Sequence, residues 1–354
     1  MTQADLLVYG ANGFTGALVV ERAHAMGLRP VVAGRSRETI EPLAKRFGLP
    51  FRVFDLADEA RVREGVRGAR VVLHCAGPYS KTSRPMLDAC LKEHVHYLDI
   101  TGEYLVLEAV LARDAEARAN GVVAIPAVGF DVVPTDCMAA SLAAALPGAV
   151  RLELAFGGEM APSPGTAKTT VENLHVGALV RQEGAIVALP APRTREIPFA
   201  SGARFAMSIP WGDLVTAHHS TGIPNITVYM VIPKLAARVV GLMRFGAPLL
   251  RRPSVIGFLQ REVAMRAKGP TAEARLRCRM SIWGRAEDAN GGAVEGQLEV
   301  PDGYELTVVA ALASAGRVLG GEVKPGATTP SKAFGADFVT GLPGVGPLSL
   351  RRVS

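Results

Sequence analysis

The chain has little cysteine, few aromatic residues and no long hydrophobic run. Its four cysteines among 354 residues show no CxxC spacing, so neither a disulfide framework nor a cysteine-based metal cluster is expected. Aromatic residues make up 6% and are not interleaved with basic ones, which argues against a base-stacking surface for nucleic acid. No uncharged apolar run reaches the roughly 18 residues of a membrane-spanning helix, so none is predicted.

The motifs of several enzyme classes are missing too. The sequence contains no HExxH zinc motif, no GxSxG nucleophile elbow and no GxxxxGK[ST] phosphate loop. No tyrosine is followed four residues later by a lysine, so the Tyr/Lys acid pair of short-chain dehydrogenases is absent. His218-His219 is interpreted as a strand pair with one ring on each face, and no metal site is predicted.

The composition indicates a globular enzyme. Hydrophobic residues make up 49% and charged residues 20%. The net charge of +6 is spread along the chain, which gives no reason to expect a nucleic-acid partner. Because the N-terminal sequence lacks the basic and apolar regions of an export signal, we expect a cytoplasmic protein.

Residues 1–130 alternate short apolar runs with amphipathic stretches. This order predicts an α/β fold, a Rossmann-type doubly wound parallel sheet with helices on both faces. The predicted strands are Leu6–Tyr9, Pro30–Ala33, Phe51–Phe54, Arg70–His74, His96–Leu98 and Val122–Ile125. The predicted helices are Gly16–Met26, Thr39–Phe47, Glu59–Val66, Arg84–His94 and Tyr104–Asn120. Beyond residue 134, a helix over 167–182 and short strands over 183–232 predict a separate α+β part.

A glycine-rich turn follows the first predicted strand and opens a helix. Its sequence is Gly10-Ala11-Asn12-Gly13-Phe14-Thr15-Gly16. Glycines let a pyrophosphate approach the backbone and let the helix pack on the strand, while the helix N-terminus offers N–H groups and its positive dipole end to the phosphates. Asn12 and Thr15 can cap the turn. The strand–turn–helix context predicts a nucleotide-binding site.

The end of the second strand indicates which nucleotide is bound. An NAD or FAD site usually places an acidic residue there to bind the ribose 2′-hydroxyl, whereas this chain has Arg35-Ser36-Arg37. Two guanidinium groups and a hydroxyl match a 2′-phosphate, so NADP(H) is the predicted cofactor. The alternative is that both arginines belong to a solvated loop.

Two further segments follow strands at the predicted ligand edge of the sheet. Asp55-Leu56 is placed to meet an adenine amino group, although Asp55 can equally cap the next helix. Gly77-Pro78-Tyr79 follows the fourth strand, where small residues allow close approach and Tyr79 can line the nicotinamide end.

The predicted catalytic residues are Tyr79 and Asp99. A carboxylate at this edge can act as a general acid or orient a proton donor, but Asp99 can equally cap the following helix, with Thr101 and Glu103 as a capping pair. Asp131 follows the next strand and is a further candidate, as are Asp136, Lys168, His218 and His219.

The segment 234–266 is apolar but studded with arginines and lysine. Such a basic amphipathic helix pair can lie on a membrane surface or cover an apolar substrate pocket. Two helices packed on a sheet with extended arginines explain the pattern as well.

In combination, these motifs resemble the saccharopine dehydrogenase-like oxidoreductases, and within them the branch that contains trans-acting enoyl reductases. The resemblance is carried by Val8–Gly16, Ala33–Ser36, Gly77–Tyr79, Tyr97–Glu103 and Gly129–Asp136. It implies a Rossmann domain at 1–135, an inserted α+β substrate and dimerisation domain at 136–320, and a C-terminal segment at 321–354 that returns to the Rossmann domain. Pro164 interrupts the Ser-Gly-Gly-Thr pattern expected at 163–166, and no match to the substrate-anchoring residues of saccharopine dehydrogenases is present.

Together, the motifs and the resemblance predict an NADPH-dependent oxidoreductase that reduces the C=C bond of an apolar or acyl substrate. A homodimer is expected from the family. Reduction of an imine or amino-acid-type substrate is the first alternative. The second is a non-catalytic NADP-binding or lipid-associated protein.

Overall fold

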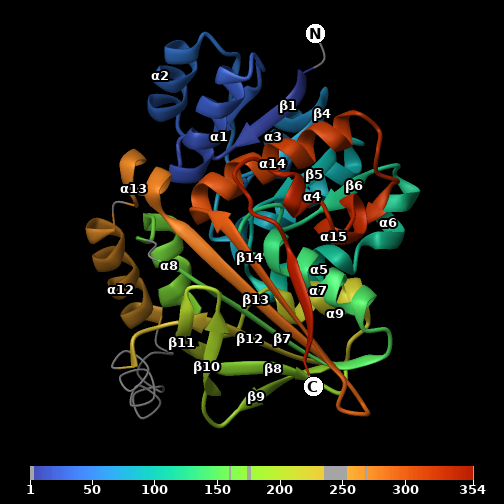
Figure 1. Cartoon of the computed structure of the whole chain (residues 1–354). Coiled ribbons are helices and arrows are strands. Elements are labelled where there is room, and N and C mark those ends of the chain that lie inside the picture. Colours follow the sequence, from blue (N-terminus) through green and yellow to red (C-terminus); the bar gives the residue numbers. More distant parts are fainter. Residues whose placement is uncertain (1–3, 159–160, 174–176, 235–252, 268, 354) are drawn as a thin grey trace. The chain divides into compact units, whose positions relative to one another are not determined.

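The computed structural model describes residues 4–158, 161–173, 177–234, 253–267 and 269–353 (Figure 1). The chain divides into two compact units. The first comprises Met1–Val133 and Tyr304–Phe334, and the second comprises Pro134–Gly303 and Gly335–Ser354.

The first unit is a parallel sheet of seven strands in the order β15-β6-β5-β4-β1-β2-β3. The strands are β1 (Ala4–Tyr9), β2 (Val31–Gly34), β3 (Phe51–Val53), β4 (Ala69–His74), β5 (His96–Asp99), β6 (Val123–Ile125) and β15 (Gly326–Ala327). Strand order reverses between β1 and β4, which is where doubly wound folds bind their ligands. The predicted Rossmann-type sheet is therefore confirmed.

Helices connect these strands. They are α1 (Phe14–Ala25), α2 (Arg37–Phe47), α3 (Glu59–Val66), α4 (Tyr79–Lys92), α5 (Tyr104–Leu111), α6 (Asp114–Ala119), α14 (Gly303–Leu319) and α15 (Pro330–Phe334). The central strands are buried along their length, as Leu7, Val8 and Val72 show with no exposed area. Such continuous burial belongs to a sheet covered on both faces. The single helix predicted over 104–120 is two helices, α5 and α6, separated at Ala112-Arg113.

The second unit is built on a mixed sheet of nine strands, whose main path is β10-β11-β12-β7-β13-β14-β16, with β8 pairing β12 and β9. Its strands are β7 (Ala149–Gly157), β8 (Ala178–Gln182), β9 (Ala185–Leu189), β10 (Thr194–Phe199), β11 (Gly202–Ser208), β12 (Asn225–Val231), β13 (Arg279–Asp288), β14 (Ala293–Pro301) and β16 (Ser349–Val353). Its helices are α7 (Val133–Ala145), α8 (Pro164–Asn173), α9 (Asp213–Thr221), α12 (Pro253–Arg266), α13 (Ala272–Arg277) and a 3-10 turn at Val339–Gly341.

Helix α7 packs on one face of this second sheet. A Cβ atom added to Gly284 would lie 2.8 Å from Met138 Cγ and 2.7 Å from Leu142 Cδ1, and one added to Gly296 would lie 2.4 Å from Met138 Sδ. Glycine at these two positions lets the helix approach the strands closely. Met138 and Leu142 of α7 therefore cover this face of the sheet.

Two local predictions in the second unit are wrong. The helix predicted over 167–182 ends at Asn173, and Ala178–Gln182 is strand β8. His218 and His219 lie on helix α9, not on a strand. The five consecutive buried residues Asp213–Ala217 include the polar Asp213 and Thr216, so polarity does not mark the exposed face and the helical period is hidden.

The division of the C-terminal part differs from the predicted boundaries. The chain re-enters the first unit at Tyr304 rather than at 321, because helix α14 packs there. Residues 335–354 belong to the second unit, where β16 pairs with β14 through Arg351 and Glu295. Four of the five β16 residues are exposed, so the sequence carries no alternating apolar signal for this edge strand.

The segment 234–266 is described only in part. Residues 235–252 lie outside the described residues, and Pro253–Arg266 forms helix α12. In the part of the chain that the structure describes, no helix combines the length and apolar character needed to cross a bilayer.

Candidate active site

The glycine turn between β1 and α1 is packed too tightly for side chains. Gly10 has a φ of +78°, and a Cβ there would lie 2.8 Å from Ala76 N in the loop after β4. A Cβ on Gly16 would lie 2.2 Å from Gly10 O. The amides of Gly10 and Ala11 both donate to Ala33 O, at 2.8 and 3.2 Å, which holds the turn against the end of β2.

The first turn of α1 presents main-chain N–H groups at this edge. Gly13 is the N-cap residue in an extended conformation, and no side chain caps the helix. Asn12 approaches the end of β2 instead, since a Cβ on Gly34 would lie 3.1 Å from its Oδ1. A helix start that is not capped by the protein is suited to phosphate, because its amides and dipole both favour an anion. Phe14 packs its ring against Tyr304 at 4.8 Å, and Thr15 follows it in the first turn.

The residues after β2 are not equivalent. Arg37 is paired with Glu41 at 3.3 Å and lies over the Phe51 ring at 5.4 Å. Ser36 occupies the N-cap position of α2 and its hydroxyl donates to Glu38 at 2.6 Å. Arg35 is exposed and has no hydrogen bond or ion pair with the described residues. The guanidinium of Arg35 is therefore the cation at this strand end that the fold leaves for a ligand.

The segments after β3 and β4 lie where the sequence predicts. Asp55 is exposed and accepts a hydrogen bond of 2.9 Å from the amide of Ala57, while Leu56 is half-buried against the core. The helix cap at this point is Asp58, which accepts from the amide of Arg61. Gly77 and Pro78 lead directly into α4, with Pro78 at the N-cap position.

Tyr79 is the first residue of α4, and its phenol points back into the unit. Its hydroxyl donates to His74 O at 3.2 Å, and its ring centroid lies 5.3 Å from that of His74. Burial and the carboxylates nearby raise the pKa of Tyr79 well above its usual value. The start of α4 is capped by Glu103, whose carboxylate accepts from the amides of Tyr79 and Ser80, both at 2.8 Å.

Asp99, at the end of β5, is fully buried and joins three segments. Its Oδ1 accepts from the amides of Thr101 and Ala127 at 3.0 and 2.8 Å, and its Oδ2 accepts from the Tyr97 hydroxyl at 2.6 Å. Burial raises the pKa of Asp99 against the opposing effect of these hydrogen bonds. The carboxylate thereby positions the loops that follow β5 and β6.

Asp131 is the half-buried carboxylate of the loop after β6. A Cβ on Gly102 would lie 2.8 Å from its Oδ2, so the carboxylate sits against the loop after β5. Burial, reinforced by the Glu103 charge, raises the pKa of Asp131 to about 7. The loop is held by Thr307 of α14, whose Oγ1 accepts from the Phe130 amide at 3.0 Å. An acid that is partly protonated at neutral pH suits proton transfer.

The other sequence candidates belong to the second unit. Asp136 accepts from Ser220 at 2.6 Å within the second unit. His218 Nδ1 lies 2.9 Å from Ile223 O at the end of α9, where His219 is its neighbour. Lys168 lies on α8. Within the described ranges no group of three His, Cys, Asp or Glu side chains is arranged to bind a metal.

One buried group at the centre of the first unit was not singled out in the sequence. His74 ends β4, has no exposed area, and neither ring nitrogen has a hydrogen-bond partner among the described residues. The rings of Tyr9, Tyr79 and Tyr97 surround it at 5.6, 5.3 and 6.4 Å. Burial lowers the pKa of His74 to about 3, so the imidazole is neutral.

Comparison with known proteins supports this interpretation of the first unit. Residues 6–125 match the model of the saccharopine dehydrogenase NADP-binding domain. A human saccharopine dehydrogenase-like oxidoreductase is 35% identical over 151 residues, which cover 37% of this chain and 35% of that protein. A Mycobacterium leprae trans-acting enoyl reductase is 32% identical over 140 residues, covering 37% of this chain and 34% of that protein.

Two further similarities complete the comparison. A Caenorhabditis elegans lipid droplet localized protein is 34% identical over 150 residues, covering 38% of this chain and 35% of that protein. The structure of apo saccharopine dehydrogenase (L-Glu forming) from Saccharomyces cerevisiae aligns with 99% of this chain and 100% of that chain, at a TM-score of 0.67 and 14% identity. This chain spans about a third of the length of these curated relatives.

The first unit is therefore an NADP-binding domain of the kind found in oxidoreductases. Residues 6–125 resemble the NADP-binding domain of saccharopine dehydrogenase, which confirms the predicted resemblance and NADP(H) as the cofactor. The full-length structural alignment confirms the fold class of a Rossmann-type domain with a second α+β domain.

Proposed function

We propose that the protein is an NADPH-dependent reductase that acts on the C=C bond of an apolar or acyl substrate. The observation that carries the proposal is Asp131, a carboxylate with a pKa of about 7 at the ligand edge of an NADP-binding sheet. The similarity to a trans-acting enoyl reductase favours the enoyl substrate class.

Different residues bind the different parts of the cofactor in this proposal. The N–H groups at the start of α1 bind the pyrophosphate, and Gly10, Gly13 and Gly16 keep the approach clear. Arg35 binds the 2′-phosphate, with smaller contributions from Ser36 and Arg37, which already have partners. Asp55 and Leu56 border the adenine, and Gly77 and Pro78 border the nicotinamide end.

NADPH, when bound, would supply a hydride to one carbon of the double bond. Asp131 donates the proton to the other carbon and is then reprotonated from solvent, so the product gains two hydrogens. Tyr79 and Asp99 act as positioning residues in this scheme. Asp99 holds the loops after β5 and β6, and the Tyr79 hydroxyl remains on His74 O.

A screen of NADPH oxidation tests the proposal. Enoyl thioesters, imines and keto acids with amines are offered in turn, and we expect turnover with enoyl thioesters that is lost in Asp131→Asn. Turnover only with imines would favour the amino-acid-type alternative. Tight NADPH binding without turnover on any of these substrates would favour a non-catalytic NADP-binding or lipid-associated protein.

The proposal includes a cytoplasmic homodimer with the second unit as substrate and dimerisation domain. Peripheral membrane contact through 234–266 is also part of it. Analytical ultracentrifugation tests the dimer, and liposome flotation at low salt tests the contact. A monomeric sedimentation coefficient, or failure to float, would remove the corresponding element without affecting the proposed reaction.

A further inference from the structure

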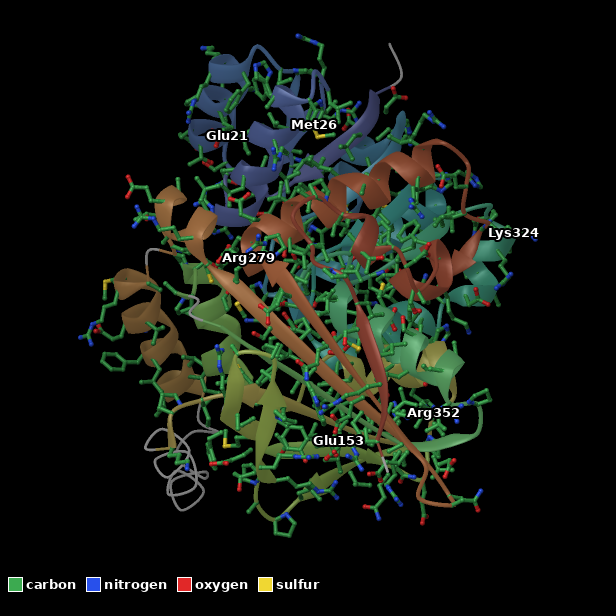
Figure 2. The ribbon with its side chains drawn as sticks, in the orientation of Figure 1. Glu21, Met26, Glu153, Arg279, Lys324 and Arg352 are labelled. Atoms are coloured by element: carbon green, nitrogen blue, oxygen red, sulfur yellow. The ribbon has the colours of Figure 1, made fainter. Side chains whose placement is uncertain are left out.

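The face of the second sheet opposite α7 carries a group of charged side chains on β7 and β13. Along β7, Leu152 and Leu154 are buried while Arg151 and Glu153 alternate with them and therefore lie on the other face. In the neighbouring strand β13, Arg285 lies opposite Glu153 and Glu287 lies opposite Arg151. Figure 2 labels Glu153 among the strands of this unit. These four side chains form one charged patch.

A cavity of about 260 Å³ opens at this patch, entirely within the second unit. Its charged lining residues are Arg151, Arg181, Arg193, Arg285, Glu153 and Glu287. Four guanidinium groups against two carboxylates leave a formal excess of two positive charges (4 − 2 = 2). Positive potential confined in a cavity attracts small anions.

The two carboxylates are already engaged. Glu287 pairs with Arg151 at 2.9 Å and with Arg285 at 2.7 Å. Glu153 pairs with Arg195, which is not among the lining residues, and accepts from the Tyr229 hydroxyl at 3.1 Å. Glu295, which is outside the lining, pairs with Arg285 at 3.0 Å, so both Arg151 and Arg285 have carboxylate partners.

Arg193 is the lining arginine best placed to bind a ligand. It is exposed and forms no ion pair with the described residues. Its Nη1 donates to Thr227 Oγ1 at 3.1 Å, and its main-chain amide donates to Ser208 Oγ at 2.9 Å, so the side chain is held at the cavity. Its remaining guanidinium donors have no hydrogen-bond partner among the described residues.

Arg181 gives the cavity a fixed cationic wall. It is 8% exposed, and its guanidinium donates to the carbonyl oxygens of Gly184 and Leu214. Buried arginines whose planar groups are held by main-chain carbonyls are pre-organised to bind planar or tetrahedral oxyanions. One guanidinium group can bind phosphate or carboxylate through two parallel hydrogen bonds.

We propose that this cavity binds a small ligand through a phosphate or carboxylate oxyanion, with Arg193 as its main contact. The volume is near the lower end of small-molecule sites, which start at about 300 Å³, so the ligand is the size of a small metabolite rather than a long acyl chain. The inference concerns the second unit alone and does not depend on the proposed reductase activity.

The test is anion binding by isothermal titration calorimetry on the full chain, with inorganic phosphate and malonate as separate probes. We expect saturable binding of at least one probe, weakened by about 10-fold to 100-fold in Arg193→Gln, as for loss of a charged hydrogen bond. Phosphate binding alone identifies a phosphate ligand, and malonate binding alone identifies a carboxylate ligand.

Arg352→Gln is the matched control: it removes the same charge from β16, outside the cavity lining, and should bind the probe as the wild type does. Arg35→Gln removes the cation of the cofactor turn and tests whether the probe binds there instead. Absence of saturable binding overturns the proposal. So does an equal loss in Arg352→Gln, or a loss confined to Arg35→Gln, which would place the anion at the cofactor turn. Retained circular dichroism shows that Arg193→Gln is folded.

Discussion

Glu103 caps a helix that begins 24 residues before it. Its two carboxylate oxygens accept from the amides of Tyr79 and Ser80, each at 2.8 Å, and so hold the start of α4 to the loop after β5. The same charge contributes to the raised pKa of Asp131. The Glu103 side chain therefore both holds the start of α4 in place and raises the pKa of Asp131.

Replacing Glu103 by Gln should separate these two effects. Loss of the charge lowers the pKa of Asp131, so the alkaline limb of the pH–rate profile should move to lower pH. The weaker cap should cost about 1 kcal/mol of unfolding free energy, measured by urea titration. A profile that stays in place while stability falls would show that Glu103 acts only structurally.

Arg35→Ala should weaken NADPH binding by about 10-fold to 100-fold, because a charged hydrogen bond to phosphate contributes about 1.5–3 kcal/mol. NADH binding should not change. Arg37→Ala is the matched control, since Arg37 is already paired with Glu41, and its effect should be much smaller. Fluorescence titration measures both nucleotides. Equal losses for NADPH and NADH in Arg35→Ala would contradict the 2′-phosphate assignment.

Asp131→Asn should lower kcat by about 100-fold or more while leaving NADPH affinity unchanged, as expected for loss of a general acid.

The pKa of Asp131 is raised to about 7, so the folded protein binds more protons than the unfolded chain between about pH 4 and 7. The contribution of Asp131 to the free energy of unfolding is therefore present at low pH and is lost as the pH rises through about 7. In Asp131→Asn the free energy of unfolding should lack this decline with rising pH. Asp58→Asn, at the cap of α3, should retain the decline.

His74 should give a pH dependence of the opposite sign. Its pKa is lowered to about 3, so between about pH 3 and 6.5 the unfolded chain binds the extra proton and stability falls as the pH falls. Relative to the wild type, His74→Leu should gain up to about 1.4 kcal/mol of unfolding free energy per pH unit on acidification. Exposed His24→Leu is the control. A pH-independent difference for His74→Leu would mean that the imidazole takes up its proton equally in the folded and unfolded states, which would contradict its burial as a neutral group.

The sequence predicts the parts of this protein that depend on local spacing. The turn at Gly10–Gly16 and the cations after β2 lie within 35 residues of one another and need only a strand and a helix to become a site. Glu103 is different, because its partners Tyr79 and Ser80 belong to another helix, and a capping pair for its own helix explained the same residues. The sequence also could not rank Asp131 above Asp99. Both residues follow buried strands. Only the structure shows that Asp99 accepts three hydrogen bonds, whereas burial raises the pKa of Asp131 to about 7.

The second unit was less predictable for a physical reason. Its strands are joined across long stretches of chain, as β7 pairs with both β12 and β13. Edge strand β16 is exposed at four of five residues, so the hydrophobic effect leaves no pattern in its sequence. The buried run at Asp213–Ala217 hides helix α9 for the converse reason.

The return of the chain to the first unit at Tyr304 bears on how the protein is made. Thr307 holds the loop that carries Asp131, and β15 pairs with β6 some 200 residues earlier, through Gly326 and Val123. During synthesis from the N-terminus, these contacts cannot form until residues 304–327 have left the ribosome. The glycine turn therefore emerges well before the contacts that complete the edge holding Asp131 can form.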